Sequence, residues 1–146
     1  MNRHTLPYWI FTVLTALALF GGALGNLTSN PEMTSTFARL GYPSYMHAIL
    51  GVWTLGAALT ILAPGLPRLK EWAYAGLTFE MTGAALSHLA SHDPLVSALP
   101  PLVVLSVALL SWWLRPTSRR LDARSHTLPR AVNASLHEPL SLSTQP

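Results

Sequence analysis

Apolar residues run along the chain in four blocks, each long enough to cross a lipid bilayer. The blocks cover about residues 6–24, 42–63, 72–90 and 95–114. A transmembrane helix needs about 20 mostly apolar residues, because about 30 Å of hydrocarbon is crossed at about 1.5 Å per residue. Helices of a soluble all-α protein keep a polar face toward water, and these blocks leave none. The pattern predicts an all-α integral membrane protein, an antiparallel four-helix transmembrane bundle.

The connection after the first block predicts a short additional helix. Residues 30–32, Asn-Pro-Glu, are typical of an N-cap, a first-turn proline and an acidic first turn, and Gly41 is typical of a helix end. These signals place a helix at about residues 31–40. Its larger apolar side chains fall on one side: Met33, Phe37 and Leu40. We expect this interfacial helix, between spans 1 and 2, to lie in the membrane interface with that side toward lipid.

The chain divides into two parts at about residue 116. Residues 1–116 contain the four blocks and form the predicted membrane domain, in which Asp93, just before Pro94, is expected to cap the fourth helix. Residues 117–146 are polar, rich in proline and basic, which is typical of a disordered tail on the cytoplasmic side.

The first block has a second interpretation. Arg3, an apolar run and the small residues of Ala23-Leu24-Gly25 also fit a secretory signal with a cleavage site. The run is long for such a signal, and its small and polar residues recur at helical spacing, which gives the block a role in contacts between helices. We therefore expect the block to be retained as a span, with cleavage as the alternative.

Composition and charge agree with a membrane protein. Half of the 146 residues are apolar and only 10% are charged, against about a quarter in soluble domains. Eight of the nine Lys and Arg residues fall on the side that holds both termini and the middle connection, and only Arg39 falls on the other. By the positive-inside rule both termini are cytoplasmic, so the basicity indicates topology and no nucleic-acid partner is expected. The chain has no cysteine, which excludes disulfide, thiolate-zinc and iron–sulfur chemistry.

Each block carries a stripe of small or polar residues at helical spacing, and the stripe of the third block contains an acid, Glu80. Such stripes let helices approach closely in lipid. Glu80 follows Glu71 by nine residues, which is about 13–14 Å along a helix and close to mid-bilayer. An ionised group there costs about 3 kcal/mol, so we expect a neutral carboxyl that donates one hydrogen bond and accepts another. The expected partners, at similar depth on neighbouring stripes, are Thr54 and Thr15.

Three histidines lie toward the outer side of the blocks. His47 lies about five residues inside the second block and His88 at the outer end of the third, and both are candidate contacts for a ligand. His88 and His92 are four residues apart and precede Asp93, a spacing that would hold a metal only if the helix continued. The proline after Asp93 indicates that the helix ends first. Interfacial hydrogen bonding is therefore expected, and no metal site is predicted.

Several short motifs mark the middle of the chain. They are Leu40-Gly41-Tyr42-Pro43, the run Pro64-Gly65-Leu66-Pro67-Arg68-Leu69-Lys70-Glu71-Trp72-Ala73-Tyr74-Ala75-Gly76, Thr82-Gly83-Ala84, Ser87-His88 and Asp93-Pro94. With these motifs, residues 6–116 resemble the DoxX-like family of small bacterial membrane proteins. The resemblance implies a four-span bundle in a bacterial cytoplasmic (inner) membrane. Relatives include subunits named for thiosulfate:quinone oxidoreductase and proteins associated with oxidant or quinone stress, which implies a quinone or a membrane redox partner.

Three functions fit these observations. The leading hypothesis is an accessory or redox-associated membrane protein in which Glu80, with His88 and His47, contacts a quinone or a partner subunit and carries a proton. A small proton-coupled transporter that uses Glu80 and a purely structural assembly subunit, including a homo-oligomer, are the alternatives. A self-contained enzyme is not predicted, because the sequence shows no nucleophile–base pair and no phosphate-binding glycine loop.

Overall fold

A computed structural model describes residues 5–116 and Arg120, and this part of the chain contains helices and turns but no strand. In chain order the helices are α1 (Thr5–Leu27), α2 (Pro31–Arg39), α3 (Met46–Leu62), α4 (Pro67–Ala90), the 3-10 turn η1 (Leu95–Ala98) and α5 (Leu99–Trp113). The prediction of an all-α fold is confirmed for these residues. Apart from Arg120, the predicted tail over residues 117–146 lies outside them.

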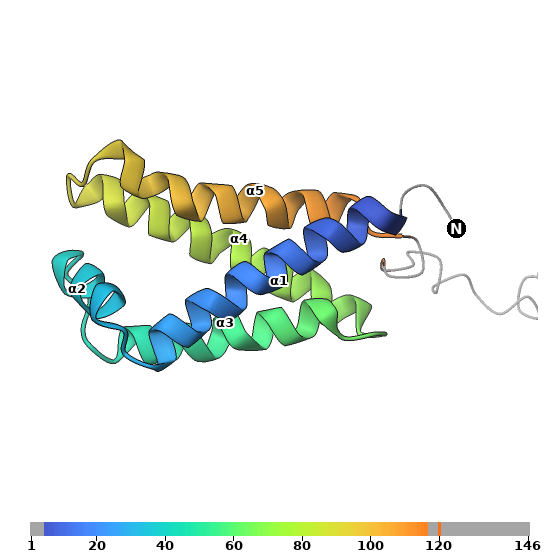
Figure 1. The fold of residues 1–146 in the computed structure, drawn as a ribbon, viewed down its shortest axis with the longest axis horizontal. Coiled ribbons are helices and arrows are strands. Elements are labelled where there is room, and N and C mark those ends of the chain that lie inside the picture. Colours follow the sequence, from blue (N-terminus) through green and yellow to red (C-terminus); the bar gives the residue numbers. More distant parts are fainter. Residues whose placement is uncertain (1–4, 117–119, 121–146) are drawn as a thin grey trace, which may run out of the picture.

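The four longer helices run up and down along the long axis of the molecule (Figure 1). α1 packs against α3 and α5, and α4 packs against the same two helices, so each has two principal neighbours. The start of α1, the turn between α3 and α4 and the end of α5 lie at one end of the molecule (Figure 1). α2 lies across the opposite end, between the end of α1 and the start of α3.

Two of the four predicted spans have the length and apolar character needed to cross a membrane: Leu6–Leu27 and Leu95–Trp113. α3 is also apolar but has only 17 residues, because the first residues of the predicted second span form a turn. In that turn the amide of Met46 donates to the carbonyl of Pro43 at 3.0 Å. α4 is long enough, with 24 residues, but carries Glu80 and His88 within its apolar part.

The short helix α2 is confirmed, and its ends follow the predicted signals. The side-chain oxygen of Asn30 accepts a hydrogen bond from the amide of Glu32 at 2.9 Å, and Pro31 is the first helical residue. After Arg39 the chain reverses through Gly41, whose φ of 81° favours glycine. None of the residues of α2 is fully buried, so α2 is the least enclosed helix of the described chain.

Lys70 is almost fully buried and caps the end of α3. Its ammonium group donates hydrogen bonds to the carbonyl oxygens of Thr60, Ile61 and Ala63. The last carbonyls of a helix have no partner in their own helix and carry the negative end of its dipole, so a cation is favourable there. In the sequence Lys70 counted among the basic residues that indicate orientation. In the structure its charge is used inside the molecule.

Arg115, just after α5, is also buried and forms a cluster with α4. One of its terminal nitrogens lies 2.6 Å from Glu71 Oε1, and its guanidinium lies 5.2 Å from the ring centre of Tyr74. The indole of Trp112 donates to the other oxygen of Glu71 at 2.8 Å. Burial raises the pKa of Glu71, but these hydrogen bonds and the charge of Arg115 outweigh it, so the pKa lies below its ordinary value.

A group of hydroxyls joins three helices in the core. Ser111 Oγ lies 2.8 Å from Thr12 Oγ1 and 2.8 Å from the phenol oxygen of Tyr74, and all three residues are buried. The contacts connect α5 with α1 and α4. Buried polar groups are stable in such a place only when they are paired. The buried apolar residues beside them are Leu19, Ala58, Ile61, Leu77 and Ala108.

Candidate ligand-binding cavity

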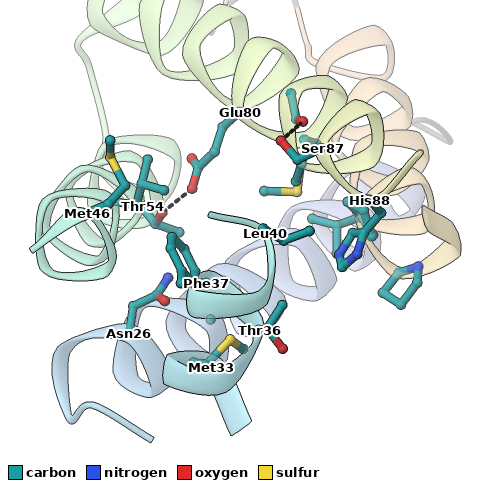
Figure 2. A pocket seen from close by; sticks show the side chains of 18 of the residues that line it. Asn26, Met33, Thr36, Phe37, Leu40, Met46, Thr54, Glu80, Ser87 and His88 are labelled. Carbon is teal, nitrogen blue, oxygen red and sulfur yellow. Dashed lines mark hydrogen bonds between the residues drawn. The ribbon is translucent and has the colours of Figure 1, made fainter. Parts of the chain in front are cut away.

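A cavity of about 450 Å³ lies between the five α-helices, under α2. The apolar residues of α2 and its end line this cavity: Met33, Phe37 and Leu40 (Figure 2). In the structure this side of α2 faces the cavity and the other helices; its predicted position in the membrane interface stays a prediction. The cavity exists because small residues, Gly22 on α1 and Gly83 on α4, line the facing helices and leave space that the larger side chains of α2 cover.

Glu80 extends from α4 into the cavity, and its Oε1 accepts a hydrogen bond from the hydroxyl of Thr54 on α3 at 2.6 Å (Figure 2). The structure thus brings these two predicted residues together. Thr15 does not join them. It is fully buried in α1, where its hydroxyl donates to the carbonyl of Phe11 at 2.8 Å. The second oxygen of the Glu80 carboxyl remains available to a ligand, because Thr54 contacts only Oε1.

A second hydrogen bond joins two residues of the cavity wall near the end of α4. The hydroxyls of Tyr42 and Ser87 lie 2.6 Å apart, and both residues line the cavity. Ser87 is seven residues after Glu80, which is about two helical turns along the same helix. Tyr42 belongs to the connection that follows α2, so this bond attaches that connection to α4.

Near the same end of α4, the carboxylate of Asp93 forms hydrogen bonds with two basic side chains. His88, which lines the cavity, has its Nδ1 at 2.7 Å from Asp93 Oδ2, and Arg39 donates to Asp93 Oδ1 at 3.0 Å. The expectation that Asp93 caps the fourth helix is wrong, because these two groups occupy its carboxylate and η1 begins without a side-chain cap. His92 is exposed, with a φ of 57°. Within residues 5–116 no group of three His, Asp or Glu side chains could hold a metal ion.

His47 lies outside the lining of the cavity. Its Nδ1 lies 3.0 Å from the backbone carbonyl of Asn26, and its ring meets Phe37 edge-on at 6.1 Å between centres. His47 thus connects α3 with α1 and α2 and does not meet Glu80. The side chain of Asn26 does line the cavity, and its buried Oδ1 has no hydrogen-bond partner among the described residues. Such an acceptor is uncommon in a folded protein, so a donor from a ligand would satisfy it.

Sequence reasoning missed Asn26, Tyr42 and Ser87 as members of the site. The available signal was the stripes of small and polar residues, because Asn26 and Ser87 lie on those of the first and third blocks. A stripe of this kind fits close helix contact as well as a cavity wall. Only the position of α2 over the stripes decides between them.

A comparison with known families bears directly on this cavity. The model of the DoxX-like family matches residues 10–111 of the chain. This chain belongs to the DoxX-like family. The matched residues include every residue that lines the cavity, and the family is membrane-associated. No curated protein and no solved structure gives a significant match to this DoxX-like chain.

The cavity of this DoxX-like protein is mainly apolar, with a few polar groups on its walls. Its volume falls within the roughly 300–1,000 Å³ typical of small-molecule sites, which are also mostly apolar with few polar contacts. A neutral Glu80 would donate a hydrogen bond through its second oxygen, and an ionised one would accept. The lining therefore suits an apolar ligand with one or two polar groups, and the chemistry its side chains offer is proton exchange.

Proposed function

We propose that this DoxX-like protein is a four-span protein of the bacterial cytoplasmic membrane. The surfaces of α3, which is apolar but short, and of α4, which is less apolar, support this proposal. Both expose large side chains: Trp53 on α3 is 72% exposed, and Phe79 on α4 is 76% exposed. Exposed apolar area on this scale marks a membrane or partner surface and is unfavourable in water. α3 and α4 therefore lie in lipid beside α1 and α5.

The proposed orientation places both termini in the cytoplasm. Arg68 belongs to the first turn of α4, and α4 begins at the end of the molecule that holds the start of α1 (Figure 1). Arg39 is the last residue of α2, which lies at the opposite end. The sequence adds further basic residues before α1 and after α5, which supports the same side by the positive-inside rule. Reporter fusions at residue 1, in the turn between α3 and α4 and after α5 are expected to report the cytoplasm, and a fusion after α2 the opposite side. Fusions that place the two termini on opposite sides would contradict the proposal.

For the cavity, we propose that it binds the ring of a quinone in a redox-associated membrane subunit. The observation that carries this proposal is the carboxyl of Glu80 at the wall of an apolar cavity, bonded through one oxygen to Thr54. A quinone ring is flat and apolar, and its reduction requires protons at its oxygens. A neutral carboxyl beside the ring supplies a hydrogen bond to one oxygen and a proton when that oxygen is reduced. The electron donor in this proposal is the redox partner subunit.

The same wall of α4 offers a path for the proton toward the α2 end. Ser87, bonded to Tyr42, and His88, bonded to Asp93, follow Glu80 along the helix and line the cavity. The hydroxyls of Ser87 and Tyr42 can relay a proton, and the imidazole of His88 can accept one. In the proposed function these groups return a proton to Glu80 after transfer.

A binding experiment with the full chain in lipid nanodiscs tests this function. The probe is a dimethoxy-methyl-benzoquinone without a side chain, and binding is followed by quenching of tryptophan fluorescence. We expect Glu80→Ala to weaken binding by about tenfold, the loss of one good hydrogen bond in an apolar site. Glu71→Gln is the matched control, because Glu71 lies on the same helix but outside the cavity. Equal affinity of Glu80→Ala and the unchanged chain would contradict the function, and proton-driven uptake by proteoliposomes that depends on Glu80 would favour a transporter.

A further inference from the structure

A second depression lies on the outer surface, between α3 and α4. This α3–α4 groove has a volume of about 600 Å³. The residues that matter for the argument are Trp53, Gly56 and Thr60 on α3, and Trp72, Gly76 and Glu80 on α4. The two tryptophans are 72% and 76% exposed, and a Cβ on either glycine would meet no atom within 4 Å. The groove is therefore open to the lipid that surrounds the proposed spans.

Glu80 belongs to the walls of both the groove and the cavity. Among the lining residues, only one other, Leu50, belongs to both spaces. Thr54, which donates to Glu80, lines the cavity but not the groove. A molecule in the groove would therefore contact the same residue, Glu80, as a molecule in the cavity.

The groove is apolar along its length and polar at one place. Among the residues that line it, apart from the indole N–H groups of the tryptophans, only Thr60 and Glu80 have polar side chains. The hydroxyl of Thr60 is already used, since it donates to the carbonyl of Gly56 at 2.7 Å. Glu80 is therefore the one carboxyl that an occupant of the groove would meet, and the rest of the occupant must be apolar.

Two side-chain contacts lie at the α2 end of the cavity. The bonds Arg39–Asp93 and Tyr42–Ser87 attach α2 and the residues after it to α4 and the turn that follows. Phe37 lines the cavity at this end (Figure 2). The α3–α4 groove is lined by two residues without a side chain, Gly56 and Gly76, as well as by the larger Trp53 and Trp72.

We propose that the ligand of Glu80 carries a long apolar chain, that it enters from the bilayer between α3 and α4, and that its chain stays in the α3–α4 groove while its polar end meets Glu80. This inference rests on the proposed function and adds to it the chain and the direction of access. A water-soluble ring that enters under α2 would have no use for the groove. A chain-bearing ligand would gain van der Waals contacts along the walls of the groove, because transfer from lipid to an apolar groove has no hydrophobic driving force.

Two glycines of α4 provide matched variants for a test. Gly76 lines the groove and Gly83 lines the cavity, and neither has an atom within 4 Å of an added Cβ. Gly76→Leu fills the groove and Gly83→Leu fills the cavity. Gly56→Leu fills the groove from α3 and serves as a second variant should Gly76→Leu fold poorly. Thermal unfolding of each variant in detergent confirms that it is folded.

Binding is measured with the full chain in nanodiscs and three probe molecules. Two probes share one dimethoxy-methyl-benzoquinone ring, with and without a decyl chain, and the third is a decylphenol, which has a chain and a hydroxyl but no quinone. We expect Gly76→Leu to weaken binding of the decyl quinone at least tenfold, because the leucine occupies the space of the decyl chain, and to leave the chainless ring within about twofold. We expect Gly83→Leu to weaken both quinones.

The remaining outcomes separate the two proposals. If Gly76→Leu and Gly56→Leu leave decyl quinone binding unchanged, the inference about the groove is wrong. If either variant instead changes the oligomeric state in light scattering, the groove is an interface between copies of this chain, and the inference is also wrong. If neither quinone binds but decylphenol binds in a way that Gly76→Leu weakens, the quinone function fails and the groove inference stands. If no probe binds, both fail.

Discussion

Arg39 and Asp93, 54 residues apart in the chain, form an ion pair of 3.0 Å that fixes the end of α2 to the turn after α4. The side chain of Asp93 is 7% exposed and also bonds His88, whereas that of Arg39 is 53% exposed. α2 has no buried residue of its own. Its position over the cavity therefore depends on this pair and on the contacts of its apolar side.

Removing the pair should loosen α2 without unfolding the protein. In Arg39→Ala, Asp93 keeps His88 as a partner, so we expect the global stability to change by no more than about 1 kcal/mol, as for other exposed pairs. We expect hydrogen exchange of the α2 amides to accelerate, because local opening becomes easier. Mass spectrometry of exchange in nanodiscs measures this, with Arg68→Ala at the other end as the control. Unchanged exchange in α2 would show that its apolar contacts alone hold it.

Lys70→Met should be among the most destabilising single changes. It keeps the apolar stem but leaves the end carbonyls of α3, which Lys70 now caps, without their donor. We expect a loss of about 2–4 kcal/mol, since buried acceptors without a partner cost about 1–3 kcal/mol each and some of these will find water. Arg68→Met, an exposed change two residues earlier, should stay within about 0.5 kcal/mol. Heat-induced loss of helicity in mild detergent measures both, and equal midpoints would contradict the capping role.

Two glycines of α3 should respond in opposite ways to alanine. A Cβ on Gly51 would lie 2.9 Å from Cγ of Leu27 and 3.1 Å from Cβ of Asn26, so α1 and α3 would have to separate. We expect Gly51→Ala to destabilise the protein by about 1–3 kcal/mol. A Cβ on Gly56 meets nothing within 4 Å, and Gly56→Ala should be neutral or stabilising by up to about 1 kcal/mol, from helix propensity. The same unfolding assay decides, and a neutral Gly51→Ala would show that the two helices contact less closely than described.

The cluster of Glu71, Trp112 and Arg115 should make stability depend on pH in the acid range. The folded pKa of Glu71 lies below its ordinary value of 4.5, so the unfolded chain takes up the proton first as the pH falls. The stabilisation is complete above the unfolded pKa and is lost as the pH falls through the folded pKa. We expect the thermal unfolding temperature of the unchanged protein to decrease as the pH is lowered below about 4.5. In Glu71→Gln this part of the decrease should be absent. Identical pH profiles for the two proteins would contradict the assigned role of the cluster.

Local signals in the sequence predicted much of the fold. Asn30, Pro31 and Gly41 fix the ends of α2 through an N-cap, a restricted φ and a positive φ, and each effect acts within a few residues. The start of α3 was missed by four residues, because Pro43 forms a turn before the helix and the apolar pattern continues through it. A pattern of apolar residues records burial or lipid contact and does not record where the backbone turns.

The sequence predicted those site residues that are unusual for their position in the chain. It did not predict residues whose role depends on which other elements pack against them. Glu80 is conspicuous as an acid within an apolar block, and Thr54 follows from equal depth on the next stripe. Asp93 looked like a helix cap, because nothing in the sequence brings Arg39 near it. The roles of Asn26 and Lys70 likewise depend on which element covers them, and that is a property of tertiary structure.

The hydroxyl contact between Thr12 and Ser111 joins two helices whose residues are 99 positions apart in the chain. In the proposed four-span arrangement, this contact forms only after α5 has joined α1 in the bilayer. Before α5 is present, the hydroxyl of Thr12 can donate to a backbone carbonyl of its own helix, as the hydroxyl of Thr15 does. A chain cut short before α5 therefore lacks this bond between α1 and α5 but leaves no unpaired hydroxyl on α1.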